Sequence, residues 1–236
     1  MTVIQASQTD EQRIDEIVKA YSEGQMEAAH RLVEALYLLF GSKALAPHVH
    51  SMKKRAKDPE HLRDKLMRKL NDCRALGESF DITSENLFER INDLAGVRII
   101  HLYTAQFPEI DRQIKLLLAS ESFEILEGPK ARVWDEEYDA IFKSFGIETE
   151  TNVRLYSSVH YVVGTGKKNA RTAEIQVRTI AEELWGEVDH AINYPHKCSV
   201  QSCREQIKVL ARVTSSCTRL VDSIFLANTE VPPKTG

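Results

Sequence analysis

The sequence lacks the features that direct a chain to a membrane or an oxidising compartment. No apolar run approaches the roughly 20 residues that a membrane-spanning helix needs. The N-terminus shows no basic segment followed by an apolar one, as a secretory signal would. The four cysteines (Cys73, Cys198, Cys203 and Cys217) show no C-x-x-C spacing, which is typical of reduced thiols. We therefore expect a cytoplasmic protein without membrane contact.

An excess of positive charge is also missing. The 31 Lys and Arg residues face 35 Asp and Glu residues, for a net charge of −4, which argues against a general nucleic-acid coat. Internal repeats and low-complexity segments are absent as well. A hydrophobic content of 42% and a length of 236 residues are sufficient for a globular protein with a sizeable core.

Hydrophobic spacing divides the chain into three parts within a single domain. Residues 1–48 are expected to form an N-terminal helical segment, residues 49–200 a core that alternates strands and helices, and residues 201–236 a C-terminal helix and tail. Strands are expected at 97–103, 123–126, 157–163 and 171–178, and helices at 107–119, 180–192 and 204–226. The stretch 128–151 has no clear period, and we expect a loop there with a short helix near 135–145.

Two acidic residues accompany two of these strands. Asp93 precedes the strand that carries Arg98, and Glu174 lies in Ala-Glu-Ile-Gln-Val-Arg-Thr. Strand alternation places Glu174, Gln176 and Arg178 on one face and the apolar residues between them on the other. Two acids on neighbouring strands suit a magnesium ion and the phosphates it bridges. The alternative is a pair of surface carboxylates in ion pairs with Arg98 and Arg178.

A basic segment precedes these strands. Between Lys53 and Lys69 there are eight Lys or Arg residues against three acids. A triphosphate site would use Arg55, Lys57 and Lys65, because guanidinium groups stack and form bidentate contacts while ammonium groups make point contacts with phosphate. The alternative is a solvated helix face.

The third group is Tyr156-x-Ser158-x-His160, a ring, a hydroxyl and an imidazole that alternation places on one strand face. A tyrosine in such a position can stack on a nucleotide base. A half-exposed strand with a tyrosine at its edge is the alternative.

The order of these motifs resembles the RelA/SpoT family of alarmone synthetases in its small, single-domain form. The motifs are Arg-x-Lys at 55–57, Asp-x-x-x-x-Arg at 93–98, Tyr-x-Ser-x-His at 156–160 and Glu-x-Gln-x-Arg-Thr at 174–179. The resemblance covers about residues 50–225. It implies an α+β fold with a mixed β-sheet of about five strands flanked by helices, nucleotidyltransferase-like, with N- and C-terminal helices.

The resemblance also implies a reaction. A GTP diphosphokinase of this family moves the pyrophosphate of ATP to the 3′-hydroxyl of GDP or GTP, giving ppGpp or pppGpp and AMP, with Mg²⁺ as cofactor. No His-Asp hydrolase motif precedes the synthetase region, so we expect synthesis without hydrolysis.

Residue roles follow from the same resemblance. Asp93 and Glu174 would bind magnesium, and Glu174 would also activate the 3′-hydroxyl. The ATP site would comprise Arg55 and Arg98 around the adenine, Lys57 and Lys65 on the phosphates, and Gln176 in the polar floor. The acceptor site would comprise Tyr156, Ser158, His160, Arg154 and Arg178.

Departures from the family pattern leave the acceptor open. Leu155 stands where family members have a glycine before the tyrosine, Arg154 replaces the charge of a nearby lysine, and His61 stands where a serine is usual. A toxin-type enzyme that pyrophosphorylates the 3′ end of tRNA, with Lys167, Lys168 and Arg171 as a basic surface, is one alternative. An adenosine-nucleotide acceptor and a non-catalytic nucleotide sensor are the others. A homo-oligomer or a regulatory partner also stays open.

Overall fold

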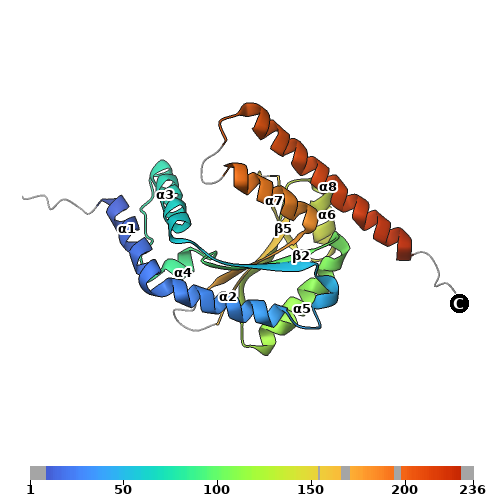
Figure 1. The fold of residues 1–236 in the computed structure, drawn as a ribbon, viewed down its shortest axis with the longest axis horizontal. Coiled ribbons are helices and arrows are strands. Elements are labelled where there is room, and N and C mark those ends of the chain that lie inside the picture. Colours follow the sequence, from blue (N-terminus) through green and yellow to red (C-terminus); the bar gives the residue numbers. More distant parts are fainter. Residues whose placement is uncertain (1–8, 154, 166–170, 194–197, 230–236) are drawn as a thin grey trace, which may run out of the picture.

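A six-stranded mixed sheet organises the chain in a computed structural model that describes residues 9–153, 155–165, 171–193 and 198–229 (Figure 1). The strand order is β1-β2-β6-β5-β3-β4. The pairs β2/β6 and β3/β4 are parallel, and the other neighbours are antiparallel. The strands are β1 (Ser51–Ala56), β2 (Ala95–His101), β3 (Glu124–Val133), β4 (Glu148–Thr151), β5 (Ser158–Gly164) and β6 (Ala173–Thr179). The expected α+β class is confirmed, with six strands rather than about five.

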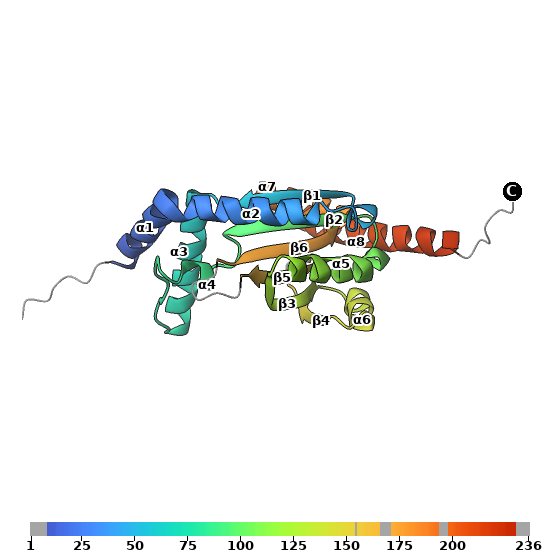
Figure 2. The same cartoon turned by 90° about the horizontal axis from the view of Figure 1, so that it is seen from below.

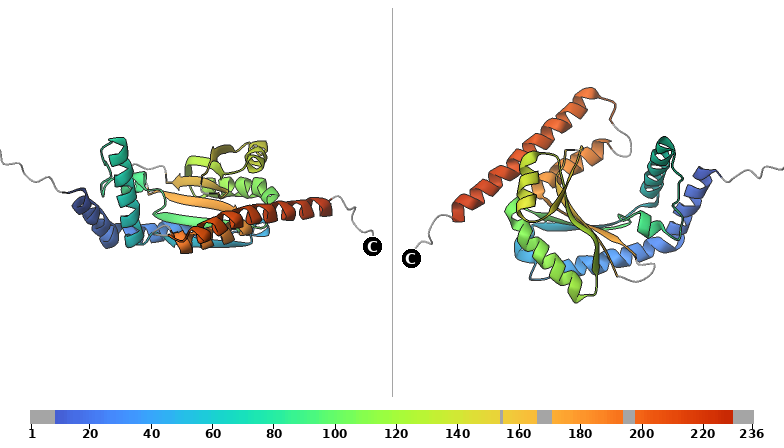
Figure 3. Two further views of the ribbon diagram at one scale, coloured as in Figure 1. Left: turned by 90° about the horizontal axis from the view of Figure 1, so that it is seen from above. Right: turned by 180° about the vertical axis from the view of Figure 1, so that it is seen from behind.

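Helices cover the sheet on both sides. Figures 1 and 2 show α2 and α5 along one face, and α7 on the opposite side, with α8 against α7. Figure 3 shows α8 projecting past the sheet toward the C-terminus. The helices are α1 (Asp10–Ala20), α2 (Met26–Phe40), α3 (Pro59–Leu76), α4 (Leu87–Arg90), α5 (Phe107–Ser120), α6 (Glu136–Ser144), α7 (Ile180–Asn193) and α8 (Gln201–Thr229). A short π-helix, η1 (Tyr21–Gln25), and two short 3-10 helices, η2 (Ala46–His48) and η3 (Thr104–Gln106), complete the list for the described residues. No helix in the described part of the chain is both long and apolar enough to span a bilayer.

Alternation along the central strands separates a core face from a polar face. Ile175 and Val177 of β6 are buried and join one core cluster with β2, β5, α2 and α5. Residues at i and i+2 share a face, so Glu174 and Gln176 point the other way. Register aligns Gln176 with Arg98 of β2 on one side and with His160 of β5 on the other. The polar residues of three strands therefore lie side by side.

Local signals in the sequence explain how the N-terminal helices attach. Asp58 caps α3 by accepting hydrogen bonds from the backbone N–H groups of Glu60 (2.8 Å) and His61 (3.4 Å), as expected for Asp-Pro at a helix start. Gly77, with φ of 71°, ends the same helix in the left-handed region. Tyr21, buried between α1 and α2, donates to the carbonyl of Lys57 at 2.7 Å. This hydrogen bond connects the N-terminal helical segment to the residue that follows β1.

Two strands were not expected. β1 carries mostly exposed polar side chains, because it is an edge strand, and its sequence therefore shows no apolar alternation. β4 is the exposed strand at the other edge. β3 continues well past the expected 123–126, and its pairing with β5 shifts register twice near Gly128. Those shifts break the period-2 pattern. For this reason the sequence predicted a loop with a short helix over 128–151, whereas the structure has strand residues on both sides of α6.

Candidate active site

Asp93 is the centre of a charged cluster at the start of β2. Its two carboxylate oxygens accept from Lys57 Nζ at 2.9 Å and Lys65 Nζ at 2.7 Å. Burial alone would raise the pKa of Asp93, but the charges and hydrogen bonds of Lys65 and Lys57 outweigh it and hold that pKa at about 2. Lys57 has a side chain only 5% exposed, and burial lowers its pKa. The acid and the two lysines predicted for phosphate and metal are thus in contact.

Glu174 is held by two polar neighbours on the sheet. His160 Nδ1 lies 2.7 Å from Glu174 Oε1, and Gln176 Nε2 donates to Oε2 at 2.8 Å. Burial would raise the pKa of Glu174, but the hydrogen bond from His160 brings the net direction below the ordinary value. Because an ionised carboxylate only accepts, Nδ1 of His160 carries the proton. Nε2 of His160 lies 2.6 Å from Ser158 Oγ. The row Ser158–His160–Glu174 is one hydrogen-bonded chain.

The charge of Asp93 acts on Glu174. The charge of Asp93 raises the pKa of Glu174, which is expected when two ionised acids border one site. No group of three His, Cys, Asp or Glu side chains in the described ranges could hold a metal ion on its own. A cation here would take two protein carboxylates and fill its remaining positions with phosphate and water, which is the usual manner for magnesium.

The two arginines pair with α7 rather than with the two acids. Arg98 Nη1 donates to Glu183 Oε1 at 3.0 Å and to Glu187 Oε1 at 3.1 Å. Arg178 also pairs with Glu183, and Lys53 Nζ lies 2.7 Å from Oε1 of the same glutamate. The alternative in which Asp93 and Glu174 are ion-paired with these arginines is therefore wrong. Sequence reasoning missed both glutamates, although their i,i+4 spacing beside the motif Arg-Thr placed them on one helix face.

Arg178 lies beneath α7 and is largely buried. Its side chain is 8% exposed, and burial lowers its pKa. A Cβ added to Gly186 of α7 would lie 2.6 Å from Arg178 Nη1. The absence of a side chain at Gly186 therefore lets α7 approach the guanidinium, which joins β6 to that helix.

Tyr156 lies in the loop before β5 rather than in the strand. Its ring stacks on Trp185 of α7, with centroids 5.8 Å apart and planes 21° apart. The preceding Leu155 has φ of 61°. This left-handed conformation favours glycine and costs other residues about 1–2 kcal/mol, which explains a glycine preference at this position. Arg154, predicted for the acceptor site, lies outside the described residues, as do Lys167 and Lys168.

Arg55 lies on exposed β1, in register with Gly96 of β2. The ring centroids of His61 on α3 and His190 on α7 are 6.4 Å apart. Burial lowers the pKa of His190, and the charge of Arg55 lowers it further. Arg55 and these two helices thus border the same polar face, where a nucleotide base would meet Arg55 and Arg98.

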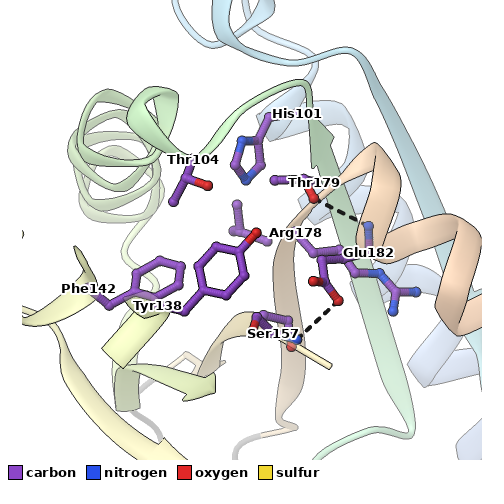
Figure 4. Close-up of a pocket in the computed structure, with 10 residues that line it drawn as sticks. His101, Thr104, Tyr138, Phe142, Ser157, Arg178, Thr179 and Glu182 are labelled. Atoms are coloured by element: carbon purple, nitrogen blue, oxygen red, sulfur yellow. Dashed lines mark hydrogen bonds between the residues drawn. The ribbon is translucent and has the colours of Figure 1, made fainter. Parts of the chain in front are cut away.

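A small pocket lies deeper, where the ends of β5 and β6 meet α6 and α7 (Figure 4). It is lined by His101, Thr104, Tyr138, Phe142, Ser157, Ser158, Val177, Arg178, Thr179 and Glu182. Glu182 accepts from the backbone N–H of Ser157 at 3.1 Å. Neither Asp93 nor Glu174 lines this pocket. Arg178 and Ser158, which were predicted for the acceptor site, do line it.

A family model matches the part of the sequence that carries these residues. Residues 54–199, more than half of the chain, match the model described as "Region found in RelA / SpoT proteins". The chain belongs to the RelA/SpoT family. The matched region begins at β1 and includes every described residue of the polar face apart from Lys53.

Individual RelA/SpoT relatives extend the comparison. The chain is 31% identical over 146 residues to GTP pyrophosphokinase YwaC of Bacillus subtilis, a match that covers 62% of this chain and 59% of that protein. The crystal structure of small alarmone synthetase 2 from Bacillus subtilis superposes with a TM-score of 0.60 at 21% identity, covering 89% of this chain and 100% of the other. Small alarmone synthetase 1 from the same organism, bound to its product pppGpp, gives 0.55 at 17% identity, covering 92% and 98%. At these identities the structural likeness establishes the fold.

Proposed function

We propose that this RelA/SpoT family member is a pyrophosphokinase that transfers the pyrophosphate of ATP to the 3′-hydroxyl of GDP or GTP, as a (p)ppGpp synthetase. The observation that carries the proposal is the pair of ionised carboxylates, Asp93 and Glu174, on one polar face beside Lys57, Lys65 and Arg98. A nucleotide-binding sensor has no chemical need for two acids held in the charged form at that position. The relative YwaC carries the name GTP pyrophosphokinase, which supports the same reaction.

The donor side of the site suits a nucleoside triphosphate. Lys57 and Lys65 present ammonium groups next to Asp93, where a phosphate chain and its cation would replace the present ion pairs. Arg55 and Arg98 border the adjacent part of the same face, from paired strands, and guanidinium planes stack well on a purine. Phosphoryl-type transfer depends mainly on such positioning and charge neutralisation.

Magnesium fits this donor set. Two ionised carboxylates that repel each other gain from a shared divalent cation, and Mg²⁺ normally takes few protein ligands when phosphates are present. Asp93 and Glu174 are the residues that would hold it. The ion would neutralise charge on the transferred phosphates.

Glu174 is the candidate general base on the acceptor side. The 3′-oxygen of the acceptor forms a bond to the β-phosphorus of ATP, the bond from that phosphorus to the α–β bridging oxygen breaks, and AMP leaves with the bridging oxygen. The proton of the 3′-hydroxyl passes to Glu174, which His160 and Gln176 hold in place through 2.7 and 2.8 Å contacts. Tyr156, whose ring stacks on Trp185, would stack on the acceptor base with its opposite face.

A pair of glutamate variants tests the assignment. Glu174→Gln should abolish transfer while isothermal titration still detects binding of a non-hydrolysable ATP analogue, because the amide preserves size but accepts no proton. Glu148→Gln, at an exposed position of β4, is the matched control and should retain wild-type turnover. Retained transfer in Glu174→Gln would remove the general base from this account.

A further inference from the structure

Two residues of α7 support the loop that carries Tyr156. Trp185 stacks on the tyrosine ring, and Glu182, one turn earlier on the helix, accepts a hydrogen bond from the backbone N–H of Ser157 at 3.1 Å. Residues three apart share a helix face, so both supports act from the same side. The loop itself does not relax easily into this shape, because Leu155 is held at φ of 61°. An external hold on the loop is therefore needed.

The same loop leads directly to the catalytic candidate. Ser158 follows Ser157 and contacts His160 at 2.6 Å, and His160 contacts Glu174 at 2.7 Å. Ser157 thus lies between the stacking ring and the hydrogen-bonded row, so a shift of its backbone would act on both. Glu182 is the residue on α7 whose side chain holds that point of the backbone.

The surroundings of Glu182 allow its carboxyl group to change protonation state near neutral pH. It is 2% exposed, and its second oxygen, Oε1, has no hydrogen-bond partner among the described residues. In the same pocket, Ser157 Oγ, Thr104 Oγ1 and Arg178 Nε are buried with no hydrogen-bond partner in the described part of the chain (Figure 4). Burial raises the pKa of Glu182 to about 7, and the Ser157 hydrogen bond opposes this only in part. The hydrogen bond from Ser157 is stronger when its acceptor is ionised.

The charged and titratable groups around Glu182 come from four elements. Arg178 lies on β6 and His101 on β2, and α6 contributes Tyr138 and its capping residue Asp135. Arg219 approaches from α8. The cations Arg178 and Arg219 favour the carboxylate, and Asp135 disfavours it. Burial keeps the pKa of His101 at about 4, so it stays neutral near neutral pH.

We propose that Glu182 is a positioning residue for the acceptor loop, Leu155–Ser158, and that it holds the loop more firmly as a carboxylate than as a neutral acid. The identity of the loop as the acceptor loop rests on the proposed function, whereas the contact itself does not. The enzyme would consequently bind its acceptor less well in mildly acidic conditions, while ATP binding, which uses other elements, would change little. Proton concentration would thereby adjust acceptor use through one buried side chain.

Trp185 provides a direct optical test that needs no turnover. The chain contains two tryptophans, so Trp134→Phe leaves Trp185 as the single indole, stacked on Tyr156. In this background the emission of Trp185 should change with a midpoint near pH 7, because the loop loosens as Glu182 gains its proton. Adding Glu182→Gln should abolish that transition, since the amide oxygen accepts from Ser157 at every pH. Adding Glu182→Leu should give the loosened emission throughout.

Steady-state kinetics then separates positioning from general structure. Glu182→Leu should raise the KM for the acceptor about 3- to 10-fold, the value of one lost hydrogen bond, with the KM for ATP unchanged. Glu182→Gln should have an acceptor KM that does not vary with pH. An emission transition that persists unchanged in Glu182→Gln, or equal KM changes for both substrates, would overturn the proposal. A chain without transferase activity would contradict the proposed function but would leave the emission result readable.

Discussion

Replacing Asp93 by Asn should destabilise the protein as well as stop transfer. In the folded chain Asp93 is the acid that pairs with the buried Lys57, at 2.9 Å, and with Lys65, at 2.7 Å. The asparagine keeps the size of the side chain but leaves the Lys57 charge without a carboxylate, and breaking a buried ion pair in this way is costly. This position therefore contributes to stability in addition to its proposed part in catalysis.

The magnitude follows from the pKa of Asp93. The two lysines lower it from 3.8 to about 2, and each pKa unit is worth about 1.4 kcal/mol, so the pairing stabilises the folded state by roughly 2 kcal/mol. Because the folded-state pKa is depressed, this contribution is complete above about pH 4 and is lost as the pH falls toward 2. At neutral pH the variant should thus show the full loss.

Urea denaturation at neutral pH measures the effect. Asp93→Asn should lower the free energy of unfolding by about 2 kcal/mol, and adding Lys57→Met should restore part of the loss by removing the unpaired buried charge. Asp15→Asn is the matched control, because Asp15 forms an exposed pair with Arg63 at 2.8 Å, and such pairs are worth about 0–1 kcal/mol. Equal stability of Asp93→Asn and wild type would refute the reasoning.

Three further outcomes are expected. Tyr156→Ala should raise the KM for the acceptor far more than that for ATP, because its proposed role is to stack on the acceptor base; equal increases would count against that role. Leu155→Gly should leave the free energy of unfolding within about 1 kcal/mol, since relief of the left-handed strain offsets lost packing, and a loss above about 3 kcal/mol would contradict this balance. Glu182→Gln should stabilise the chain by up to about 3 kcal/mol at pH 8 and hardly at all at pH 4.5. The raised pKa of Glu182 means that wild type loses stability as pH rises from about 4.5 to 7, so equal melting temperatures at pH 8 would be inconsistent with it.

The sequence predicted the elements with strong periodicity. The helices within the N-terminal segment 1–48 and near 107–119 and 180–192, and the strands of the central sheet, were confirmed because their apolar spacing reflects one buried face. The edge strands β1 and β4 were missed because both faces of an edge strand can be polar. β3 was shortened because shifts in pairing register erase alternation.

The sequence predicted which residues form the site better than it predicted their ion-pair partners. The motifs identified Asp93, Glu174 and the lysines, and the fold brings them to one polar face. Spacing along the chain carries no information on which acid meets which cation, so Glu183 and its pairing with Arg98 and Arg178 were not foreseen. Strand alternation placed Arg178 on the polar face with Glu174 and Gln176, but the pattern of β6 alone does not show that α7 covers it through the close approach at Gly186.

The most direct test of the proposed activity is a product assay with terminally labelled ATP and Mg²⁺, offering GDP, GTP, AMP, ADP and bulk tRNA in separate reactions. The account predicts that label moves to GDP or GTP and that AMP is released in equal amount. Label that moves only to tRNA or to an adenosine nucleotide would contradict the guanosine acceptor. Binding of nucleotides without any transfer would contradict the enzymatic function itself.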